Sequence, residues 1–277
     1  MTRAALLQLN ASDDPVANLV TTRDFLRQAA LGGAKFVLTP EVTNCISSSR
    51  SHQNRVLQPQ SQDQTLAALR QDAQTYGIWL LIGSLALKTE DAEGRFANRS
   101  FLITPVGEIA AWYDKIHMFD VTVSDTETYR ESAGYRPGTR AVCADTPFGG
   151  LGMTICYDLR FPYLHRKLAQ AGATILTVPS AFSPVTGAAH WAPLLQARAI
   201  ETGCYVLAPA QTGTHNANLN RPRKTYGHSL AVSPWGEIIA DAGTDACVTF
   251  ITLDSNAPEA ARRKIPALRH DQLFDGP

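Results

Sequence analysis

The sequence lacks the cysteine pattern of a cross-linked or metal-stapled protein. Its five cysteines, at positions 45, 143, 156, 204 and 247, are odd in number and scattered, and no two form a CxxC pair. Disulfide frameworks and structural zinc sites both need paired cysteines at regular spacings. We therefore expect neither of them, and we expect no metal and no cofactor.

Net charge and long apolar runs are missing as well. Lys plus Arg and Asp plus Glu number 25 each, so no excess charge favours nucleic acid or a membrane surface as a partner. No window of eighteen apolar residues is present, and the N-terminal MTRAALLQLN lacks the features of a signal peptide. Charged residues make up only 18%, which favours an oligomer with much buried surface. We predict a cytoplasmic protein without a nucleic-acid or membrane partner.

The chain does have ample apolar sequence, arranged as alternating strands and helices. Hydrophobic residues make up 44% of its 277 residues, which is enough for a large core. The first part of the chain predicts helices at 15–31 and 64–76, ended by Gly32-Gly33 and Gly77. It also predicts strands at 3–9, 35–38, 78–87, 97–104 and 109–113.

A second alternation of strands and helices follows. The apolar strand that ends at Cys156 precedes helices at 164–171 and 189–203 and strands at 174–178, 204–208, 228–233, 237–241 and 249–253. Polar segments at 44–62, 116–140 and 211–225 predict loops, and a short helix from Pro258 precedes a basic tail. Two alternations indicate an α/β fold of two half-sheets stacked face to face with helices outside. Because no repeat or linker divides the chain, we predict a single domain over 1–277.

Cys156 lies at a turn from a strand to a helix. Apolar residues ending in Thr154 and Ile155 precede it, and Pro162 suits the first turn of the helix that follows. Such a turn places a thiol at the carboxyl edge of a sheet, where α/β proteins hold their ligands. Backbone N–H groups after the cysteine would lower the pKa of the thiol and bind an oxyanion. The alternative is an inert buried cysteine.

Two more ionisable residues, Glu41 and Lys115, also follow apolar strands. A strand end is a rigid mount, and neighbouring strands bring their ends together. With Cys156 these residues supply a nucleophile, a base and a positive charge, which is the minimum for cleaving a carbon–nitrogen bond without a metal. Taken singly, Glu41 reads as a solvated loop acid and Lys115 as a surface cation.

Three segments together resemble the signatures of the nitrilase superfamily of carbon–nitrogen hydrolases. They are Thr39-Pro40-Glu41, Tyr113-Asp114-Lys115-Ile116-His117 and Ile155-Cys156-Tyr157-Asp158-Leu159-Arg160-Phe161-Pro162. Further similarity to the amidase branch runs through Pro179-Ser180-Ala181-Phe182, Ala189-His190-Trp191, Ala197-Arg198-Ala199-Ile200-Glu201, Tyr226-Gly227-His228-Ser229 and Pro234-Trp235-Gly236. Within that branch the chain is most similar to deaminated glutathione amidases, with ω-amidases second.

The resemblance implies a four-layer αββα sandwich that dimerises to αββα-αββα, with the C-terminal tail, about 258–277, at the dimer interface. It implies a triad of Glu41, Lys115 and Cys156, and a second glutamate ahead of a Pro-Gly. Glu131, before Arg136-Pro137-Gly138, fits that place, although it also reads as a loop acid.

The implied mechanism starts when Glu41 takes the proton of Cys156 and the thiolate attacks an amide carbonyl. Lys115 and the N–H of Tyr157 would stabilise the oxyanion. A thioester would remain, which water activated by Glu41 would hydrolyse, while Glu131 orients Lys115. Two carboxylates near a thiolate should raise the pKa values of the glutamates towards neutral.

The expected substrate-binding residues lie near these motifs. Tyr157, Arg160, Phe182, Thr186 and His190 line the expected pocket, and Arg160 suits a substrate carboxylate. Three of them have an ordinary alternative: an ion pair with Asp158 or another acid for Arg160, core packing for Phe182 and a structural role for His190. Two departures, Tyr163 where relatives often have an acid and Ala192 where they often have Glu, bear on the substrate.

We therefore predict an amidase for a small-molecule amide, with deaminated glutathione hydrolysed to 2-oxoglutarate and Cys-Gly as the first choice. An ω-amidase acting on 2-oxoglutaramate, or another small-amide or nitrile hydrolase, is the near alternative. A non-catalytic dimeric binding protein and a Cys-His hydrolase using one of the seven histidines are alternatives of other classes.

Overall fold

The computed structural model describes residues 1–124, 127–216 and 222–276, and within these ranges it contains two six-stranded mixed sheets. The first has the order β16-β1-β2-β3-β4-β5, and its three central strands are parallel. Its strands are β1 (Thr2–Gln8), β2 (Phe36–Leu38), β3 (Trp79–Leu87), β4 (Ala97–Ile103), β5 (Ile109–Asp114) and β16 (Cys247–Leu253).

The second sheet has the order β15-β14-β11-β10-β9-β8 and is also parallel at its centre. Its strands are β8 (Val142–Thr146), β9 (Gly149–Met153), β10 (Ala173–Thr177), β11 (Tyr205–Ala208), β14 (Leu230–Val232) and β15 (Ile238–Asp241). Two hairpins lie outside the sheets: β6 (Asp120–Ser124) with β7 (Glu127–Arg130), and β12 (Thr212–His215) with β13 (Arg223–Tyr226).

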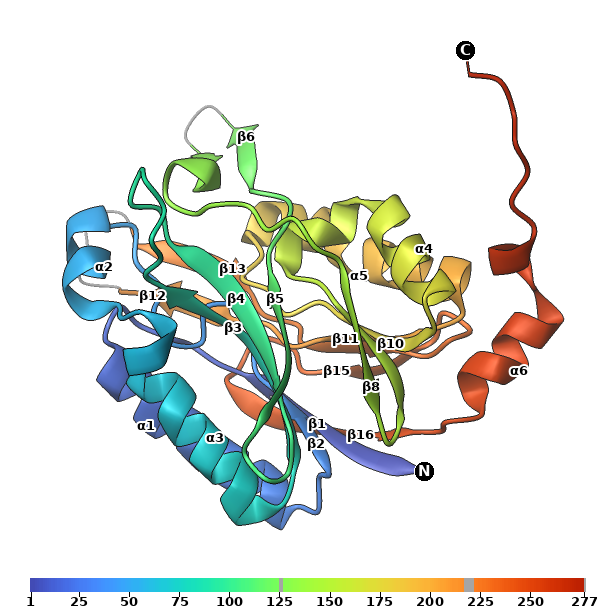
Figure 1. Ribbon diagram of the computed structural model, residues 1–277, viewed down its shortest axis with the longest axis horizontal. Helices are drawn as coiled ribbons and strands as arrows, with labels where there is room; N and C mark the ends of the chain where they lie inside the picture. Colours follow the sequence, from blue (N-terminus) through green and yellow to red (C-terminus); the bar gives the residue numbers. More distant parts are fainter. Residues whose placement is uncertain (125–126, 217–221, 277) are drawn as a thin grey trace.

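The helices cover the outer faces of the stacked sheets. Figure 1 shows α1 and α3 on one side of the sheets and α4 and α5 on the other. The α-helices are α1 (Pro15–Leu31), α2 (Arg50–Val56), α3 (Gln64–Tyr76), α4 (Pro162–Gln170), α5 (Pro184–Thr202) and α6 (Ala257–Lys264). Short 3-10 helices are η1 (Gln60–Gln62), η2 (Glu131–Ala133), η3 (Cys156–Arg160) and η4 (Ala267–Arg269). The predicted arrangement of two stacked sheets with helices outside is confirmed.

Local sequence explains why the helices begin and end where they do. Asp14 caps α1 by accepting a hydrogen bond from the N–H of Val16, and Asp63 caps α3 through the N–H of Leu66. Gly77 ends α3 in the left-handed conformation (φ 60°), which glycine adopts without strain. These caps match the predicted helix boundaries of 15–31 and 64–76.

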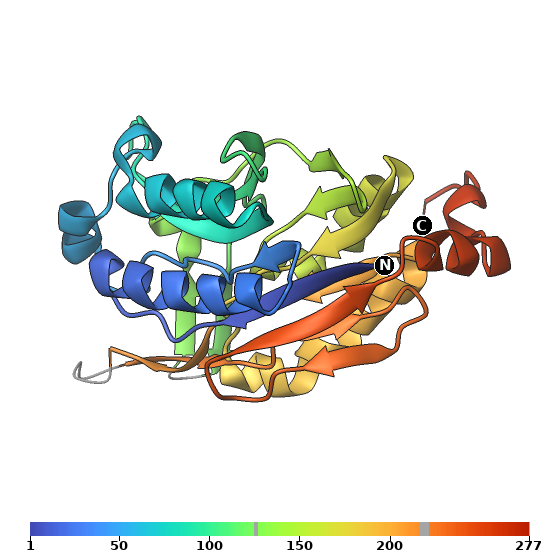
Figure 2. The same ribbon diagram turned by 90° about the horizontal axis from the view of Figure 1, so that it is seen from below.

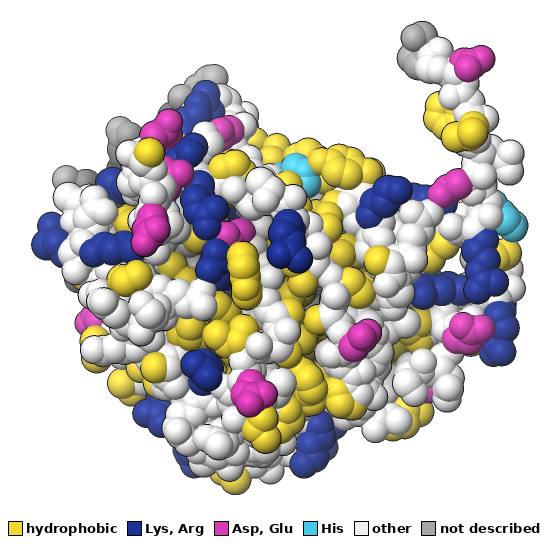
Figure 3. All heavy atoms as spheres, viewed as in Figure 1, with side chains coloured by type: hydrophobic (Ala, Val, Ile, Leu, Met, Phe, Trp, Pro, Cys, Tyr) yellow, Lys and Arg dark blue, Asp and Glu magenta, His cyan; other side chains and the backbone are white. Residues whose placement is uncertain are grey.

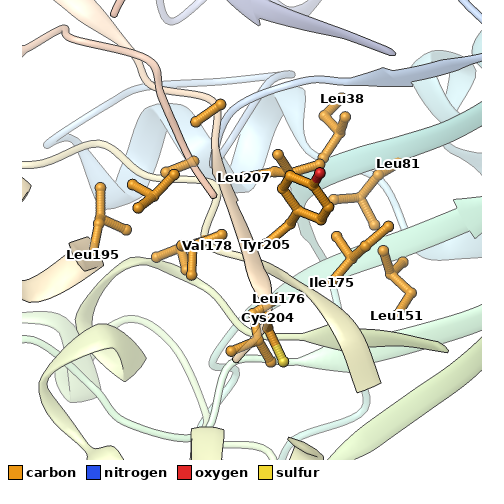
Figure 4. Close-up of a cluster of buried hydrophobic side chains, with 14 of the residues drawn as sticks. Leu38, Leu81, Leu151, Ile175, Leu176, Val178, Leu195, Cys204, Tyr205 and Leu207 are labelled. Atoms are coloured by element: carbon orange, nitrogen blue, oxygen red, sulfur yellow. The ribbon is translucent and has the colours of Figure 1, made fainter. Parts of the chain in front are cut away.

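The core between the sheets is continuous with the layer under α4 and α5. In Figure 4, Leu38 and Leu81 from the first sheet point towards Ile175 and Tyr205 from the second. A separate cluster, which includes Leu26, Leu69 and Leu80, packs α1 and α3 against the first sheet. The molecule therefore has one large core that reaches both sheets and one outer layer that belongs to the first sheet.

Several predicted loops contain regular structure. The segment 44–62 includes α2 and η1, and its Cys45 and Ile46 are buried, so its interpretation as a surface loop was wrong. The segments 116–140 and 211–225 contain the two hairpins, except for 125–126 and 217–221, which lie outside the described residues. Helix α5 begins at Pro184, five residues before the predicted start at 189, and it continues through Pro193. Strand β8 was not predicted.

The C-terminal segment extends away from the two sheets. Figure 2 shows α6 at one end of the molecule, and Figure 1 shows the chain beyond it projecting outwards. Arg262 attaches α6 by donating to the backbone oxygens of Thr202 and Ala173, whereas Leu273 and Phe274 are fully or almost fully exposed. The predicted position of this tail at a dimer interface remains a prediction, and Pro277 lies outside the described residues.

Candidate active site

The three residues that follow predicted strand ends meet in a buried cluster. Glu41 follows β2, Lys115 directly follows β5, and Cys156 opens η3 after β9. The Nζ of Lys115 donates to Oε1 of Glu41 over 2.9 Å. Lys115 is 2% exposed, Glu41 3% and Cys156 7%. Neither Glu41 nor Lys115 is therefore a solvated surface charge, and the expectation that the strand ends converge is met for this pair.

Glu131 completes the surroundings of the Lys115 ammonium. Its Oε1 and Oε2 accept from Nζ over 2.9 and 2.8 Å, and its Oε2 also accepts from the N–H of Phe119 over 2.6 Å. The ammonium thus contacts two carboxylates, one of which belongs to Glu131, the acid that we expected to be the second glutamate. Its role in a reaction remains a prediction.

The backbone is strained at two positions in this cluster. Cys156 has φ +50° and Val42, next to Glu41, has φ +47°, in the left-handed region that side chains with a Cβ rarely adopt. Hydrogen bonds hold both residues there: Cys156 N–H donates to Pro179 O over 3.0 Å, and Val42 N–H donates to Ser84 Oγ over 2.7 Å. Strain of this kind gathers at sites where the surrounding structure fixes a particular geometry.

Two glycines allow the motif segments to approach neighbouring backbone. A Cβ on Gly83 would lie 2.0 Å from Thr39 O, and one on Gly138 would lie 2.2 Å from Asp114 O. Gly138 also donates its N–H to Lys115 O over 2.7 Å. The Pro-Gly that follows Glu131 in sequence therefore packs directly against the end of β5, which positions Lys115.

The charges in the cluster set the protonation of its members. Burial favours the neutral form of Lys115, but the carboxylates of Glu131 and Glu41 outweigh it and hold the pKa of the ammonium well above its usual value. Burial would likewise raise the pKa of Glu41, but the charge and hydrogen bond of Lys115 bring it below its usual value. The expectation that the pKa of Glu41 rises towards neutral was therefore wrong, because one ammonium lies in direct contact with it.

The thiol of Cys156 departs from expectation in the opposite direction. Burial raises its pKa most, and the negative charge of Glu41 adds to the rise. The charge of Lys115 and a hydrogen bond from the N–H of Ala181 oppose these effects without cancelling them. The expectation of a lowered thiol pKa was wrong, and the resting cluster holds a neutral thiol beside a carboxylate.

Three groups that sequence reasoning missed hold Glu41 in place. Asn98 Nδ2 donates to its Oε1 over 2.9 Å, the N–H of Ala181 donates to its Oε2 over 2.9 Å, and Gln211 Nε2 donates to its backbone oxygen over 3.0 Å. Asn98 lies within β4 and is 2% exposed, and asparagine is disfavoured in strands. That mismatch is a signal that the sequence did contain.

Most of the predicted substrate-binding residues lie around η3 and the start of α5. The Cζ of Arg160 lies 5.9 and 5.7 Å from the ring centroids of Tyr157 and Phe182, and its Nη2 lies 3.3 Å from Nδ1 of His190. Phe182 is buried in the core against Trp191, whereas His190 is exposed. Thr186 lies on the first turn of α5, and its hydroxyl donates to Ser183 O over 3.4 Å.

The alternative ion pair between Arg160 and Asp158 is absent from the described residues. Asp158 instead accepts from the hydroxyl of Tyr113 over 2.7 Å and lies 2.7 Å from Nδ1 of His117. His117 in turn contacts the hydroxyl of Tyr163, one of the two departures from the family pattern. Arg160 is thus left with aromatic and histidine neighbours.

Arg223 is a second guanidinium that sequence reasoning missed. It lies on β13, and its Nη2 donates to Ala181 O over 3.0 Å. Its charge lowers the pKa of Glu41 and opposes the burial that raises the pKa of Tyr129 to about 12. Because Arg223 falls in a segment that we predicted as a loop, nothing in the sequence linked it to Glu41.

Two surface cavities lie elsewhere. One, of about 520 Å³, is lined mainly by residues of η1, α3 and the ends of β3 and β4; the other, of about 460 Å³, runs along β5, and the two share Ile109 and Arg136 among their lining residues. Figure 3 shows hydrophobic side chains gathered over this part of the surface, where β5 and β8 run. Neither cavity includes a residue of the Glu41–Lys115–Cys156 cluster, so chemistry and not volume identifies the candidate site.

Within the described part of the chain, no group of three or more His, Cys, Asp or Glu side chains is arranged to hold a metal ion. In the same ranges, every helix is too short or too polar to cross a membrane.

The chain is similar to known proteins over nearly its whole length. The sequence profile of the family described as carbon-nitrogen hydrolase matches residues 3–263. The chain is 39% identical over 274 residues to a deaminated glutathione amidase from Yersinia enterocolitica, covering 97% of this chain and 92% of that protein.

Solved structures are similar over nearly the whole chain. The NitFhit protein of C. elegans has a TM-score of 0.89 and 32% identity, and the alignment covers 98% of this chain and 65% of that one. The Nit3 protein of Saccharomyces cerevisiae, described as a member of branch 10 of the nitrilase superfamily, has a TM-score of 0.84 and 29% identity over 97% of this chain and 96% of that one.

Proposed function

The chain belongs to the carbon–nitrogen hydrolase family of the nitrilase superfamily, and we propose that Glu41, Lys115 and Cys156 make it an amidase that works through a thioester. The observation that carries this proposal is the buried 2.9 Å contact between Lys115 Nζ and Glu41 Oε1, beside a thiol held in a strained backbone conformation. Buried charges are costly unless paired, so their place next to a nucleophile favours a catalytic role.

Acylation follows from the resting protonation of the cluster. The thiol is neutral and Glu41 is ionised, so Glu41 accepts the thiol proton as the sulfur attacks the carbonyl carbon and the C–S bond forms. The developing oxyanion is stabilised by Lys115 and by the N–H of Tyr157 near the start of η3. Glu41 then gives its proton to the nitrogen, the C–N bond breaks, and the amine leaves.

Deacylation reverses the roles. Glu41 takes a proton from water, the resulting hydroxyl attacks the thioester carbon, and the C–S bond breaks as the thiol is protonated again. The net reaction consumes one amide and one water and gives one acid and one amine. Throughout, Glu131 holds the Lys115 ammonium with two hydrogen bonds, so we assign it the role of orienting this cation.

For the substrate, we propose an amide with carboxylates, with deaminated glutathione as the first choice. The Yersinia relative carries that name, and the products would be 2-oxoglutarate and Cys-Gly. Arg160 and Arg223 support the proposal, because each lies near the cluster and the structure describes no carboxylate paired with either one. A guanidinium binds a carboxylate through two parallel hydrogen bonds.

The test offers purified protein a panel of amides and follows the release of acid and amine. Deaminated glutathione, 2-oxoglutaramate, an uncharged amide and a nitrile separate the proposed activity from the ω-amidase and nitrilase alternatives. We expect Arg160→Met to raise KM for the two carboxylate-bearing amides at least about tenfold and to leave the uncharged amide unaffected. Hydrolysis of none of the panel by well-folded protein would end the proposal of amidase activity by this cluster.

We further propose that the chain is a single domain that forms a homodimer through α5 and the C-terminal tail. The exposed side of α5 carries Val185 and Ile200, and Leu273 and Phe274 project from the tail. Sedimentation of the full chain and of a chain ending at residue 264 tests this: we expect a dimer for the first and weaker association for the second. A monomeric full chain at micromolar concentration would contradict the proposal.

A further inference from the structure

Asn98 contacts both carboxylates of the candidate active site. It lies at the second position of β4 and is 2% exposed. Its Nδ2 donates to Glu41 Oε1 over 2.9 Å and to Glu131 Oε1 over 3.4 Å. Its backbone oxygen also accepts the N–H of Lys115 over 3.0 Å. One residue thus contacts both glutamates by its side chain and the lysine by its main chain.

The contacts of Asn98 offset an unfavourable balance of charge in the cluster. Two carboxylates share one ammonium, and Lys115 Nζ reaches an Oε1 atom of each over 2.9 Å. The net charge of the three groups is −1, and like charges held together favour uptake of a proton by one of them. A second donor in contact with the same two oxygen atoms stabilises both ionised forms without adding charge.

The oxygen of the Asn98 side chain destabilises the fold, in contrast to its nitrogen. Asn98 Oδ1 is buried and has no hydrogen-bond partner in the described structure. An unpaired buried acceptor is destabilising, and a threonine or valine would suit a strand better. The contacts of Asn98 Nδ2 with the two carboxylates therefore explain why an amide occupies this position.

We propose that Asn98 is a positioning residue that keeps Glu41 and Glu131 ionised together around Lys115. The proposal rests on the proposed function of Glu41 as the base that takes the thiol proton. The other titratable or charged groups around the pair are Cys156 on η3, Arg223 on β13 and Tyr135 after η2. Asn98 is the neutral donor to both carboxylates.

The test is the pH dependence of Cys156 alkylation by iodoacetamide in Asn98→Leu, which removes the donor and keeps the branched shape of the side chain. The Cys156 peptide is followed by mass spectrometry, because four other cysteines are present. Loss of a hydrogen bond to a carboxylate should move the acid limb of the alkylation rate up by about one to two pH units. The same upward shift is expected for the acid limb of kcat/KM.

The same measurement in a chain that carries Glu131→Gln tests whether the amide of Asn98 acts on both carboxylates. In Glu131→Gln only one carboxylate remains, so removing Asn98 there should move the acid limb less than half as far. An equal shift in both backgrounds would overturn the proposal, because Asn98 would then act on Glu41 alone. A slower reaction with an unmoved acid limb would overturn it too, since that is the result of a merely structural role.

Controls separate this proposal from folding and from the choice of substrate. Ser100→Ala lies on the same strand and removes a buried hydrogen bond to Ile82 O, so it should lower stability without moving the acid limb. If Asn98→Leu does not fold, Asn98→Ala removes the same donor with less bulk. Because alkylation needs no substrate, a protein that hydrolyses none of the amides still gives a decisive result for Asn98.

Discussion

Residues 2–115 and 149–241 follow a similar succession of elements but contribute differently to the site. Apart from α2 in the first half, the β12–β13 hairpin in the second and the short 3-10 helices, each half runs through a parallel strand, a helix, a second strand, a helix and a third strand, and then two antiparallel strands. The turn after the first strand of the second half carries Cys156, whereas its counterpart after β1 carries Leu9. Leu9 pairs with Gln211 of the other half, so the turn of the first half joins the two halves, whereas the turn of the second half carries the thiol of the candidate site.

The groups of the candidate site also come partly from one half and partly from the other. The first half supplies Glu41 after β2 and Lys115 after β5, while the second half supplies the thiol and the N–H of Ala181, which donates to Glu41 over 2.9 Å. Neither half holds a complete set. The comparison teaches that the site exists only where the two sheets meet, and that each half can be disturbed separately.

The largest expected effect comes from removing the base supplied by the first half. Glu41→Gln keeps the shape and the contact with Lys115 but cannot accept the thiol proton, so kcat/KM should fall about 10⁴-fold. A Cys-His hydrolase would lose little activity, and a non-catalytic binding protein would have none to lose. Asp72→Asn, an acid of the same half that pairs with Arg23 outside the site, is the matched control and should leave the rate unchanged.

The next largest effect tests the charge balance between Lys115 and the two glutamates. Lys115→Met leaves the carboxylates of Glu41 and Glu131 buried without their cation, which should cost about 3–5 kcal/mol of the free energy of unfolding and at least 100-fold in rate. Adding Glu131→Gln removes one of these charges, so urea unfolding should show a double variant that is more stable than Lys115→Met alone. If the double variant is the less stable, the two glutamates do not depend on the same cation.

The sequence was sufficient to predict those features for which local signals and the fold agree. Helix α3 was predicted with both ends because Asp63 caps it and Gly77 ends it. The meeting of Glu41 and Lys115 followed from strand ends. Although β3 and β4 lie between them, β2 and β5 run in the same direction, so their carboxyl ends lie at the same edge of the first sheet. The burial of these two residues was not predicted, because each taken singly suggested a solvated charge.

Sequence failed where tertiary contacts decide. Helix α2 was missed because its sequence is polar and short. Its Arg50 stacks on Phe96, which precedes β4 and is distant in the sequence, with Cζ 3.8 Å from the ring centroid. The pKa directions of Glu41 and Cys156 were wrong because they depend on the depth of burial and on one ammonium. Arg223 was missed because its place beside Ala181 is set by a hairpin that no local pattern revealed.

A smaller effect compares the apolar layers of the two halves. Leu69 packs α3 on the first sheet in a cluster without active-site residues, whereas Leu195 on α5 belongs to the core that contains Cys156. Both are fully buried, so Leu69→Ala and Leu195→Ala should each cost about 2–5 kcal/mol. Only Leu195→Ala should lower kcat, by roughly tenfold, because a shift of η3 misplaces the thiol. Equal loss of kcat in both folded variants would show that the halves are not separable.

The smallest effect compares two buried histidines. Burial lowers the pKa of both His165 on α4 and His215 on β12 to about 4, so each is neutral in the folded chain. The unfolded chain takes up their protons below its histidine pKa of about 6.5. Each therefore contributes stability above pH 6.5 that is lost as the pH falls towards 4, on the order of 3 kcal/mol.

The two histidines differ in their hydrogen bonds, so the same substitution should change stability by a different amount at each. His165 bonds only to Phe161 O and its Nε2 has no partner, whereas His215 bonds to Ala11 O and Thr225 Oγ1, both over 2.7 Å. At pH 7, His165→Leu should change the free energy of unfolding by less than about 1 kcal/mol, while His215→Leu leaves two polar partners unpaired and should cost about 1–3 kcal/mol. Both variants should lose less stability than the parent between pH 6.5 and 4, measured by urea unfolding at each pH. An unchanged pH dependence would mean that these imidazoles are already protonated in the folded state, and the burial argument would fail with it.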